Sequence, residues 1–271
     1  MKTTVLLVIS SAILTACSSP ENTITPASSG SQTSSLVESG KSEVSKLSPI
    51  IQITNYYATS NGETRVTLNG SQLTISWQLK NTYEYDSQNR LTRQTTTARN
   101  NSNWWEELSY QYTPDLTQRY RNSENKDMLN ILLLNERGYI KGNEGPDEYV
   151  YNEDGYLIRY RGNNQQDTYT IKDGNVVARE TVFNSGSVQR NTYEYDLTKP
   201  GLPSPLTFRG QQSKNLLTKQ TLVTTDTKSS ASDTNVFVYS YDTDKQGRPI
   251  REFVIANTEP SPRSIREFIY Q

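Results

Sequence analysis

The chain has 271 residues, with 28 Lys and Arg against 29 Asp and Glu, so its formal net charge is −1. This balance provides no basic face for nucleic acid. The sequence has no His and one Cys, which excludes Ser-His-Asp and Cys-His catalysis, His-ligated zinc and an intramolecular disulfide. Hydrophobic residues make up 32% and Tyr is abundant, which favours sheets with a water-facing side over a large closed core.

Residues 1–16 have the features of an export signal that is later removed. Lys2 provides a positive charge, and the apolar run over 5–14 is too short for a membrane-spanning helix, which needs about 20 residues. The following Leu-Thr-Ala-Cys, ending at Cys17, resembles the lipobox of bacterial lipoproteins. The resemblance implies lipid attachment at Cys17 and an envelope location, with Ser18 favouring the outer membrane of a Gram-negative bacterium. The alternative is an ordinary secretory signal with an unrelated cysteine.

Residues 17–49 follow as a segment rich in Ser, Thr, Gly and Pro, with no hydrophobic period. This composition predicts a disordered tether behind the lipidated cysteine. The character changes at residue 50, and we expect a β domain over 50–271.

Short alternating segments then appear at Ile51–Tyr57, Thr64–Leu68 and Gln72–Leu79. Asn69-Gly70 lies between two of them and Asp173-Gly174 lies further along the chain, and both pairs predict tight β-hairpins because each turn residue needs a positive φ.

A repeat underlies this pattern. The six residues Asn81–Asp86 recur letter for letter as Asn191–Asp196. A looser unit, Tyr-x-Tyr-Asp/Asn followed by a turn, an apolar residue and x-Arg, recurs at 83–93, 149–159 and 239–251. The two Tyr share one strand face, and Asp or Asn caps the turn. The repeat predicts an all-β fold, an antiparallel meander of about six to eight hairpins that forms a twisted, curled open sheet.

The unit resembles the YD repeat of Rhs-type proteins, which in large members builds a shell around a toxin. This chain is too short to enclose such a cargo. It also resembles small YD-like envelope lipoproteins of unknown function from Gram-negative bacteria, in which a stretch like Gly210–Lys219 follows a Tyr-rich hairpin. Here the stretch comes after an irregular Pro-rich segment, Lys199–Pro205. The resemblance implies fold and location, and no activity.

Two candidate sites stand out. Trp104 and Trp105 point to opposite faces of a strand, so one could stack on a sugar ring; the alternative is burial on both sides of the sheet. Asp242–Gly247 resembles the start of a calcium loop, but the bidentate Glu of an EF-hand is replaced by Phe253, so we interpret it as a turn. No catalytic residue, metal ligand or cofactor is predicted.

The sequence leaves three functions open. The first is a non-catalytic envelope module that binds or scaffolds a glycan or an envelope protein, attached to the membrane through its N-terminal lipid. The second is a carrier of a lipid or hydrophobic ligand in a half-open β structure. The third is a carboxylate-based glycan hydrolase, for which no pair of carboxylates is singled out.

Overall fold

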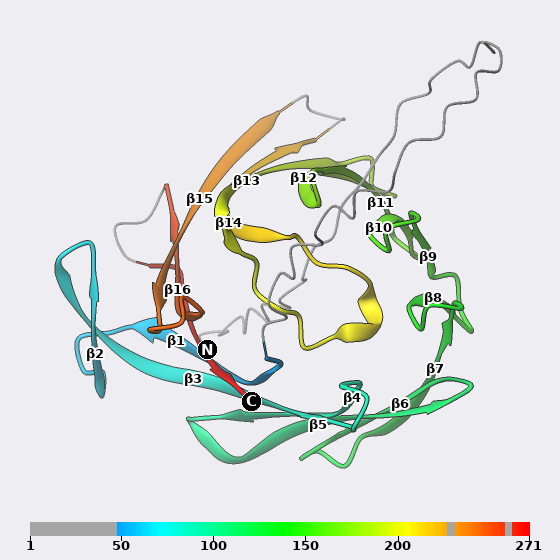
Figure 1. Cartoon of the computed structure of the whole chain (residues 1–271), viewed down its shortest axis with the longest axis horizontal. Helices are drawn as coiled ribbons and strands as arrows, with labels where there is room; N and C mark the ends of the chain where they lie inside the picture. Colours follow the sequence, from blue (N-terminus) through cyan, green and yellow to red (C-terminus); the bar gives the residue numbers. More distant parts are fainter. Residues whose placement is uncertain (1–47, 227–230, 258–261) are drawn as a thin grey trace, which may run out of the picture.

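The computed structural model describes residues 48–226, 231–257 and 262–271, which form a closed antiparallel β-barrel (Figure 1). Sixteen strands make the ring, and β1 (Ile50–Ala58) pairs with both β3 (Ser71–Tyr85) and β17 (Ser264–Tyr270). β2 (Thr64–Leu68) pairs with β3 and lies outside the ring. The other strands are β4 (Leu91–Ala98), β5 (Asn101–Thr113), β6 (Asp115–Asn122), β7 (Asp127–Leu134), β8 (Ile140–Asn143), β9 (Glu148–Tyr151), β10 (Leu157–Arg161), β11 (Gln165–Lys172), β12 (Asn175–Phe183), β13 (Val188–Pro200), β14 (Asn215–Thr225), β15 (Ser232–Thr243) and β16 (Pro249–Ala256).

The predicted all-β class and antiparallel order are correct, but the predicted open curled sheet is wrong. The first and last strands pair from Ile50 opposite Tyr270 to Tyr56 opposite Ile265, which closes the sheet on itself. Closure removes both exposed sheet edges, with their unpaired backbone groups. This pairing joins the two ends of the domain, so no local pattern of alternation or turn residues could reveal it.

The two predicted tight turns are confirmed. Asn69 and Gly70 have φ values of 49° and 81°, and Asp173 and Gly174 have φ values of 52° and 76°. Positive φ at both central residues is the geometry whose twist matches the flanking strands.

An Asp side chain caps two turns of the repeat, and for Asp86 this is the residue that the sequence predicts. The Asp86 carboxylate accepts hydrogen bonds from the backbone N–H groups of Gln88 and Arg90, both at 2.9 Å. In the copy at 239–251 the predicted cap, Asp242, pairs instead with Arg251, and Asp244 makes the same two bonds with the N–H groups of Gln246 and Arg248. The side chain thus takes over the backbone groups that the turn leaves unpaired.

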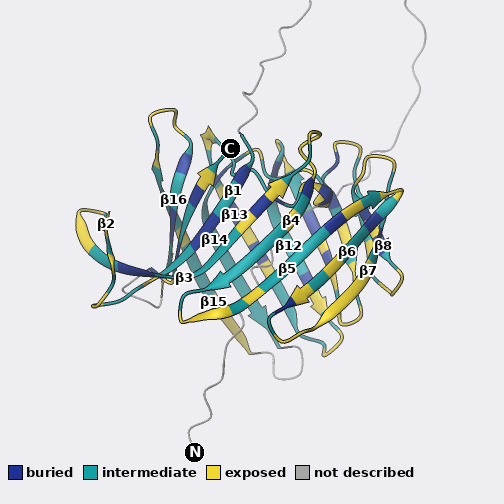
Figure 2. Ribbon diagram, turned by 90° about the horizontal axis from the view of Figure 1, so that it is seen from below, coloured by how far each residue is buried: buried dark blue, intermediate teal, exposed yellow. Residues whose placement is uncertain are grey.

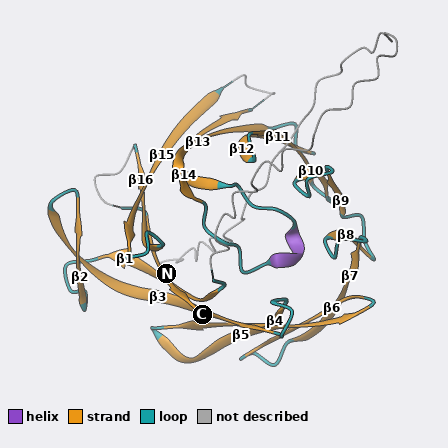
Figure 3. Cartoon of the chain, viewed as in Figure 1, coloured by secondary structure: helices purple, strands orange, loops and turns teal. Residues whose placement is uncertain are grey.

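Alternation along each strand divides inward from outward residues. Tyr83 and Tyr85 are buried or half-buried, whereas Glu84 between them is exposed. The interior is filled by such Tyr and aliphatic residues together with a segment of the chain itself, Gly201–Lys214, which we call the inner segment. Figure 3 shows its short 3-10 helix η1 (Thr207–Arg209) within the ring. Phe208 at its centre is buried, with its ring 5.2 Å from that of Tyr110.

The inner segment is attached to two hairpin turns at one end of the barrel. The backbone N–H of Gln211 donates to the Gly155 carbonyl, and the backbone N–H of Lys214 donates to the Gly174 carbonyl, both at 2.9 Å. Gly210 has a φ of 84°, and a Cβ there would lie 2.6 Å from the Gly155 carbonyl oxygen, so only Gly fits. The segment expected to be irregular is therefore part of the barrel's core, which explains how so polar a chain fills a closed barrel.

A smaller apolar cluster lies outside the ring. Val66 of β2 packs with Ile75, Phe253 and Ile265, all of them buried. β2 thus covers an apolar patch of the outer wall that would otherwise face water. Within the described residues, no helix has the length and apolar character required to cross a membrane.

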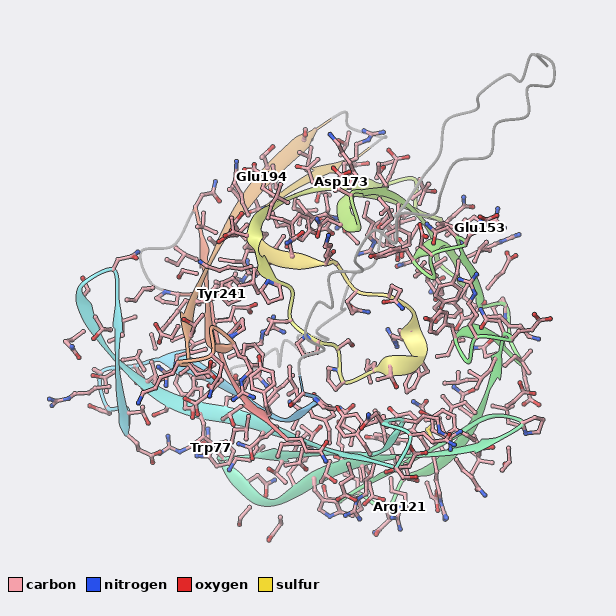
Figure 4. The ribbon with its side chains drawn as sticks, in the orientation of Figure 1. Trp77, Arg121, Glu153, Asp173, Glu194 and Tyr241 are labelled. Atoms are coloured by element: carbon pink, nitrogen blue, oxygen red, sulfur yellow. The ribbon has the colours of Figure 1, made fainter. Side chains whose placement is uncertain are left out.

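The outer wall carries several pairs of charged side chains. Figure 2 shows exposed residues along the strands, and Figure 4 places Arg121 on the outer side of the ring. Oppositely charged side chains pair across neighbouring strands, which is the arrangement of a water-facing sheet. A membrane-spanning barrel instead presents an outward apolar band about 25 Å tall. The pairs are Glu84–Arg93, Glu107–Arg121, Arg119–Asp127, Glu148–Arg159, Glu180–Arg190 and Glu194–Lys219.

Candidate ligand-binding cavity

A cavity of about 260 Å³ lies inside the barrel, between the inner segment and the wall. This is roughly nine times the ~30 Å³ that a water molecule occupies in the liquid, so the space can hold a small organic molecule. The wall residues come from β1 and from β12 to β17, and Leu202, Pro203 and Pro205 come from the inner segment. Aliphatic and aromatic side chains predominate in the lining, as in most ligand pockets.

One ion pair lies in the cavity wall. Glu252 and Arg266 are directly opposite each other on β16 and β17. Nε and Nη2 of Arg266 lie 2.7 and 2.6 Å from the same oxygen, Oε1 of Glu252. The Glu252 side chain is 2% exposed and that of Arg266 is 27% exposed. Burial opposes the charged guanidinium, but the attraction of Glu252 outweighs it and raises the pKa of Arg266. The Arg266 guanidinium is therefore charged at neutral pH.

The tyrosines of the lining have most of their hydroxyls engaged by the protein. Tyr239 donates to Gln220 Oε1 at 2.8 Å, and Tyr241 donates to the Leu217 carbonyl at 2.9 Å. Burial raises the pKa of Tyr239 to about 12, so its hydroxyl stays protonated at neutral pH. With their hydroxyls bound in this way, Tyr239 and Tyr241 contribute mainly their aromatic rings to the cavity. The buried hydroxyl of Tyr193 has no hydrogen-bond partner among the described residues.

Polar contacts continue from the cavity along the inner wall. The Gln220 amide donates to Asn191 Oδ1 at 2.8 Å, and Asn191 lies opposite Arg179 in the strand pairing. Arg179 forms a second inward ion pair with Asp167 at 2.8 Å, and Asp167 is 2% exposed. The Tyr169 hydroxyl donates to the same Asp167 carboxylate at 3.1 Å. These contacts place two groups of side-chain hydrogen bonds on the inner face of β11–β14, adjacent to each other where Asn191 lies opposite Arg179.

The residues singled out from the sequence lie elsewhere. Trp105 is 37% exposed and faces outward opposite Thr97, while Trp104 is half-buried on the other side of β5. Neither Trp lines the cavity, and their stacking on a sugar stays a prediction. Cys17 lies outside the described residues. The Asp242–Gly247 stretch contains the Asp244-capped turn described above, and the described residues hold no cluster of three or more carboxylates or other metal ligands.

A repeated tetrapeptide in the sequence indicates the Glu252–Arg266 ion pair, but only when two strands are compared with each other. The tetrapeptide Ile-Arg-Glu-Phe occurs at 250–253 and again at 265–268. Antiparallel pairing places each Arg opposite the Glu of the other copy. Because neighbouring residues face opposite ways, Glu252–Arg266 points into the barrel and Arg251–Glu267, at 2.6 Å, points outward.

No family model matches the chain, and no curated protein matches it. Among solved structures, it is similar to a porin-like protein from Bacteroides uniformis ATCC 8492, with a TM-score of 0.48 and 14% identity over 83% of this chain and 98% of that one. A porin-like protein from Bacteroides vulgatus ATCC 8482 gives a TM-score of 0.31 and 11% identity over 83% of this chain and 99% of that one.

Proposed function

We propose that the chain is a non-catalytic envelope lipoprotein whose barrel binds a small molecule in its internal cavity. The observation that carries the proposal is the 260 Å³ cavity with a mostly apolar lining and one ion pair in its wall. Such a combination of apolar surface and a few placed polar groups is typical of ligand sites.

The cavity does not have the chemistry of the hydrolase alternative. Glycoside hydrolysis uses two carboxylates about 5–10 Å apart, one of them free to act as acid or base. Among the described residues that line the cavity, Glu252 is the one carboxylate, and it is bound to Arg266. This arrangement supports binding rather than turnover.

For location, we propose that lipid at Cys17 attaches the protein to the membrane while the barrel stands in water. The lipobox-like residues before Cys17 support the anchor, and the charged pairs around the outer wall support the aqueous setting of the barrel. A lysine or arginine on a lipid-facing strand costs about 2–4 kcal/mol at mid-membrane, and this wall carries several.

Carriage of a hydrophobic ligand is the second candidate. It no longer requires a half-open sheet, because the closed barrel itself encloses apolar side chains such as Ile53, Leu216 and Phe268 around the cavity. Binding and carriage differ in whether the ligand is passed on, and the same cavity serves both.

Filling the cavity tests the proposal. Leu217 lines it, so Leu217→Trp should weaken binding of the uncharged fluorescent probe N-phenyl-1-naphthylamine at least ten-fold. Leu197 is 70% exposed, so Leu197→Trp is a matched control that should bind the probe as the unaltered protein does. Equal binding by both variants, or no binding by the unaltered protein, would overturn the proposal.

A further inference from the structure

The charge of the cavity is balanced within a single ion pair. Among the described residues that line it, Glu252 and Arg266 are the two that carry charge. A bound anion would be attracted by Arg266 and repelled by Glu252, and a bound cation would meet the reverse. The pair therefore gives the cavity no net charge.

The pair still offers a hydrogen-bond donor. Arg266 uses Nε and Nη2 on one oxygen of Glu252. Its remaining nitrogen, Nη1, has no hydrogen-bond partner among the described residues. A guanidinium group has five donors, and those of Nη1 remain for a hydroxyl or carbonyl oxygen of a ligand.

Apolar side chains gather on one part of the cavity wall. Phe268 and Ile53 are opposite each other in the β17–β1 pairing, and both pack in the cluster that includes Leu202 and Phe208 of the inner segment. Arg266 is the next inward residue along β17, further from the turns that hold the inner segment. A ligand can thus place an apolar body against Phe268, Ile53 and Leu202 and a polar head at Arg266.

From these observations, and resting on the proposed function, we infer that the cavity selects uncharged amphiphiles. The ligand has an apolar body and a neutral head that accepts a hydrogen bond, such as a hydroxyl or carbonyl group. Heads with a full charge are disfavoured because the Glu252–Arg266 pair is already neutral.

Competition among eight-carbon compounds tests this selection. Displacement of N-phenyl-1-naphthylamine is measured for 1-octanol, octanoate and octylammonium. The unaltered protein should bind 1-octanol at least ten-fold more tightly than either ion. Because apolar partitioning alone favours an alcohol, the decisive measurement is how this order changes in variants of the pair.

Glu252→Gln leaves Arg266 without its counter-charge, so octanoate should gain at least ten-fold relative to 1-octanol. Arg266→Gln should favour octylammonium in the same way, and this second variant tests the idea if the first does not fold. The matched control is Glu267→Gln, which removes one negative charge, as Glu252→Gln does, but from the outward ion pair. This variant should bind the three compounds in the same order of affinity as the unaltered protein.

An unchanged order in whichever pair variant folds would overturn the selection, and so would binding of octanoate or octylammonium to the unaltered protein as tightly as 1-octanol. If the selection fails but Leu217→Trp still blocks 1-octanol, the cavity remains the binding site and the proposed function stands. If Leu217→Trp leaves every displacement unchanged, the proposed function itself fails.

Discussion

The hydroxyl of Tyr112 donates a hydrogen bond of 3.0 Å to the backbone carbonyl of Leu91, the first residue of the neighbouring strand. The same contact recurs around the barrel. In each case the second Tyr of a Tyr-x-Tyr pair, or its equivalent on β17, reaches a carbonyl at or near the start of a neighbouring strand. The equivalent pairs are Tyr85–Ile50, Tyr195–Val176, Tyr241–Leu217 and Tyr270–Pro249. The Tyr repeat thus links neighbouring strands through hydrogen bonds from Tyr hydroxyls to backbone carbonyls.

Tyr112→Phe should lower the free energy of unfolding by about 1–3 kcal/mol, because it leaves the Leu91 carbonyl without its partner in a half-buried site. Urea denaturation followed by circular dichroism measures the change. Tyr57→Phe is the control, since Tyr57 is 40% exposed, and it should stay within ~0.5 kcal/mol of the unaltered protein. Equal effects of the two variants would contradict the role given to the Tyr112 hydroxyl.

Stability should fall in alkali because many tyrosines are buried. Burial raises the pKa values of Tyr112, Tyr195, Tyr239 and Tyr270 to about 12, against about 10 in the unfolded chain. Above pH ~10 the unfolded state loses these protons first, so the stabilisation present below pH 10 disappears between pH 10 and 12. Denaturation midpoints should be flat from about pH 6 to 9, since the chain has no His. A midpoint unchanged at pH 11 would contradict this.

Asp167→Asn should destabilise the fold by about 3–5 kcal/mol, because it leaves Arg179 charged and unpaired in the barrel interior. Asp127→Asn removes an acid of the same type from an exposed outer pair with Arg119 and should leave the denaturation midpoint unchanged. Calorimetry of both variants makes the comparison. Similar losses would mean that the inward pair is no more buried than the outer one.

Phe208→Ala should cost about 3–5 kcal/mol by opening a cavity against Tyr110. It should also loosen the inner segment, so hydrogen exchange at the Gln211 amide, which is bonded to the Gly155 carbonyl, should accelerate. Leu197→Ala on the outer wall should change neither quantity. Unaltered exchange at Gln211 in Phe208→Ala would show that backbone contacts alone hold the segment in place.

Cys17→Ser should abolish incorporation of a labelled fatty acid and leave the barrel in the soluble fraction, because two or more acyl chains are needed for stable attachment. Labelling and fractionation of cells that express each form make the test. Ser18→Ala is a matched neighbouring change and should retain the label. Label that persists in Cys17→Ser would show that the lipobox interpretation is wrong.

Local chemistry in the sequence determined much of this protein. The Asn69-Gly70 and Asp173-Gly174 turns, the Asp86-type caps and the all-β antiparallel order follow from φ preferences and side-chain alternation, which act over a few residues. Because these effects act between close neighbours in the chain, the sequence alone was enough to predict them.

The tertiary structure decided the rest. Closure of the ring joins Ile50 to Tyr270, and the inner segment becomes core only because the ring surrounds it. The cavity pair needed the register of β16 against β17, which turns two identical tetrapeptides into one inward and one outward ion pair. Each of these depends on strands meeting in space, and a one-residue change of register would reverse which charges face the cavity.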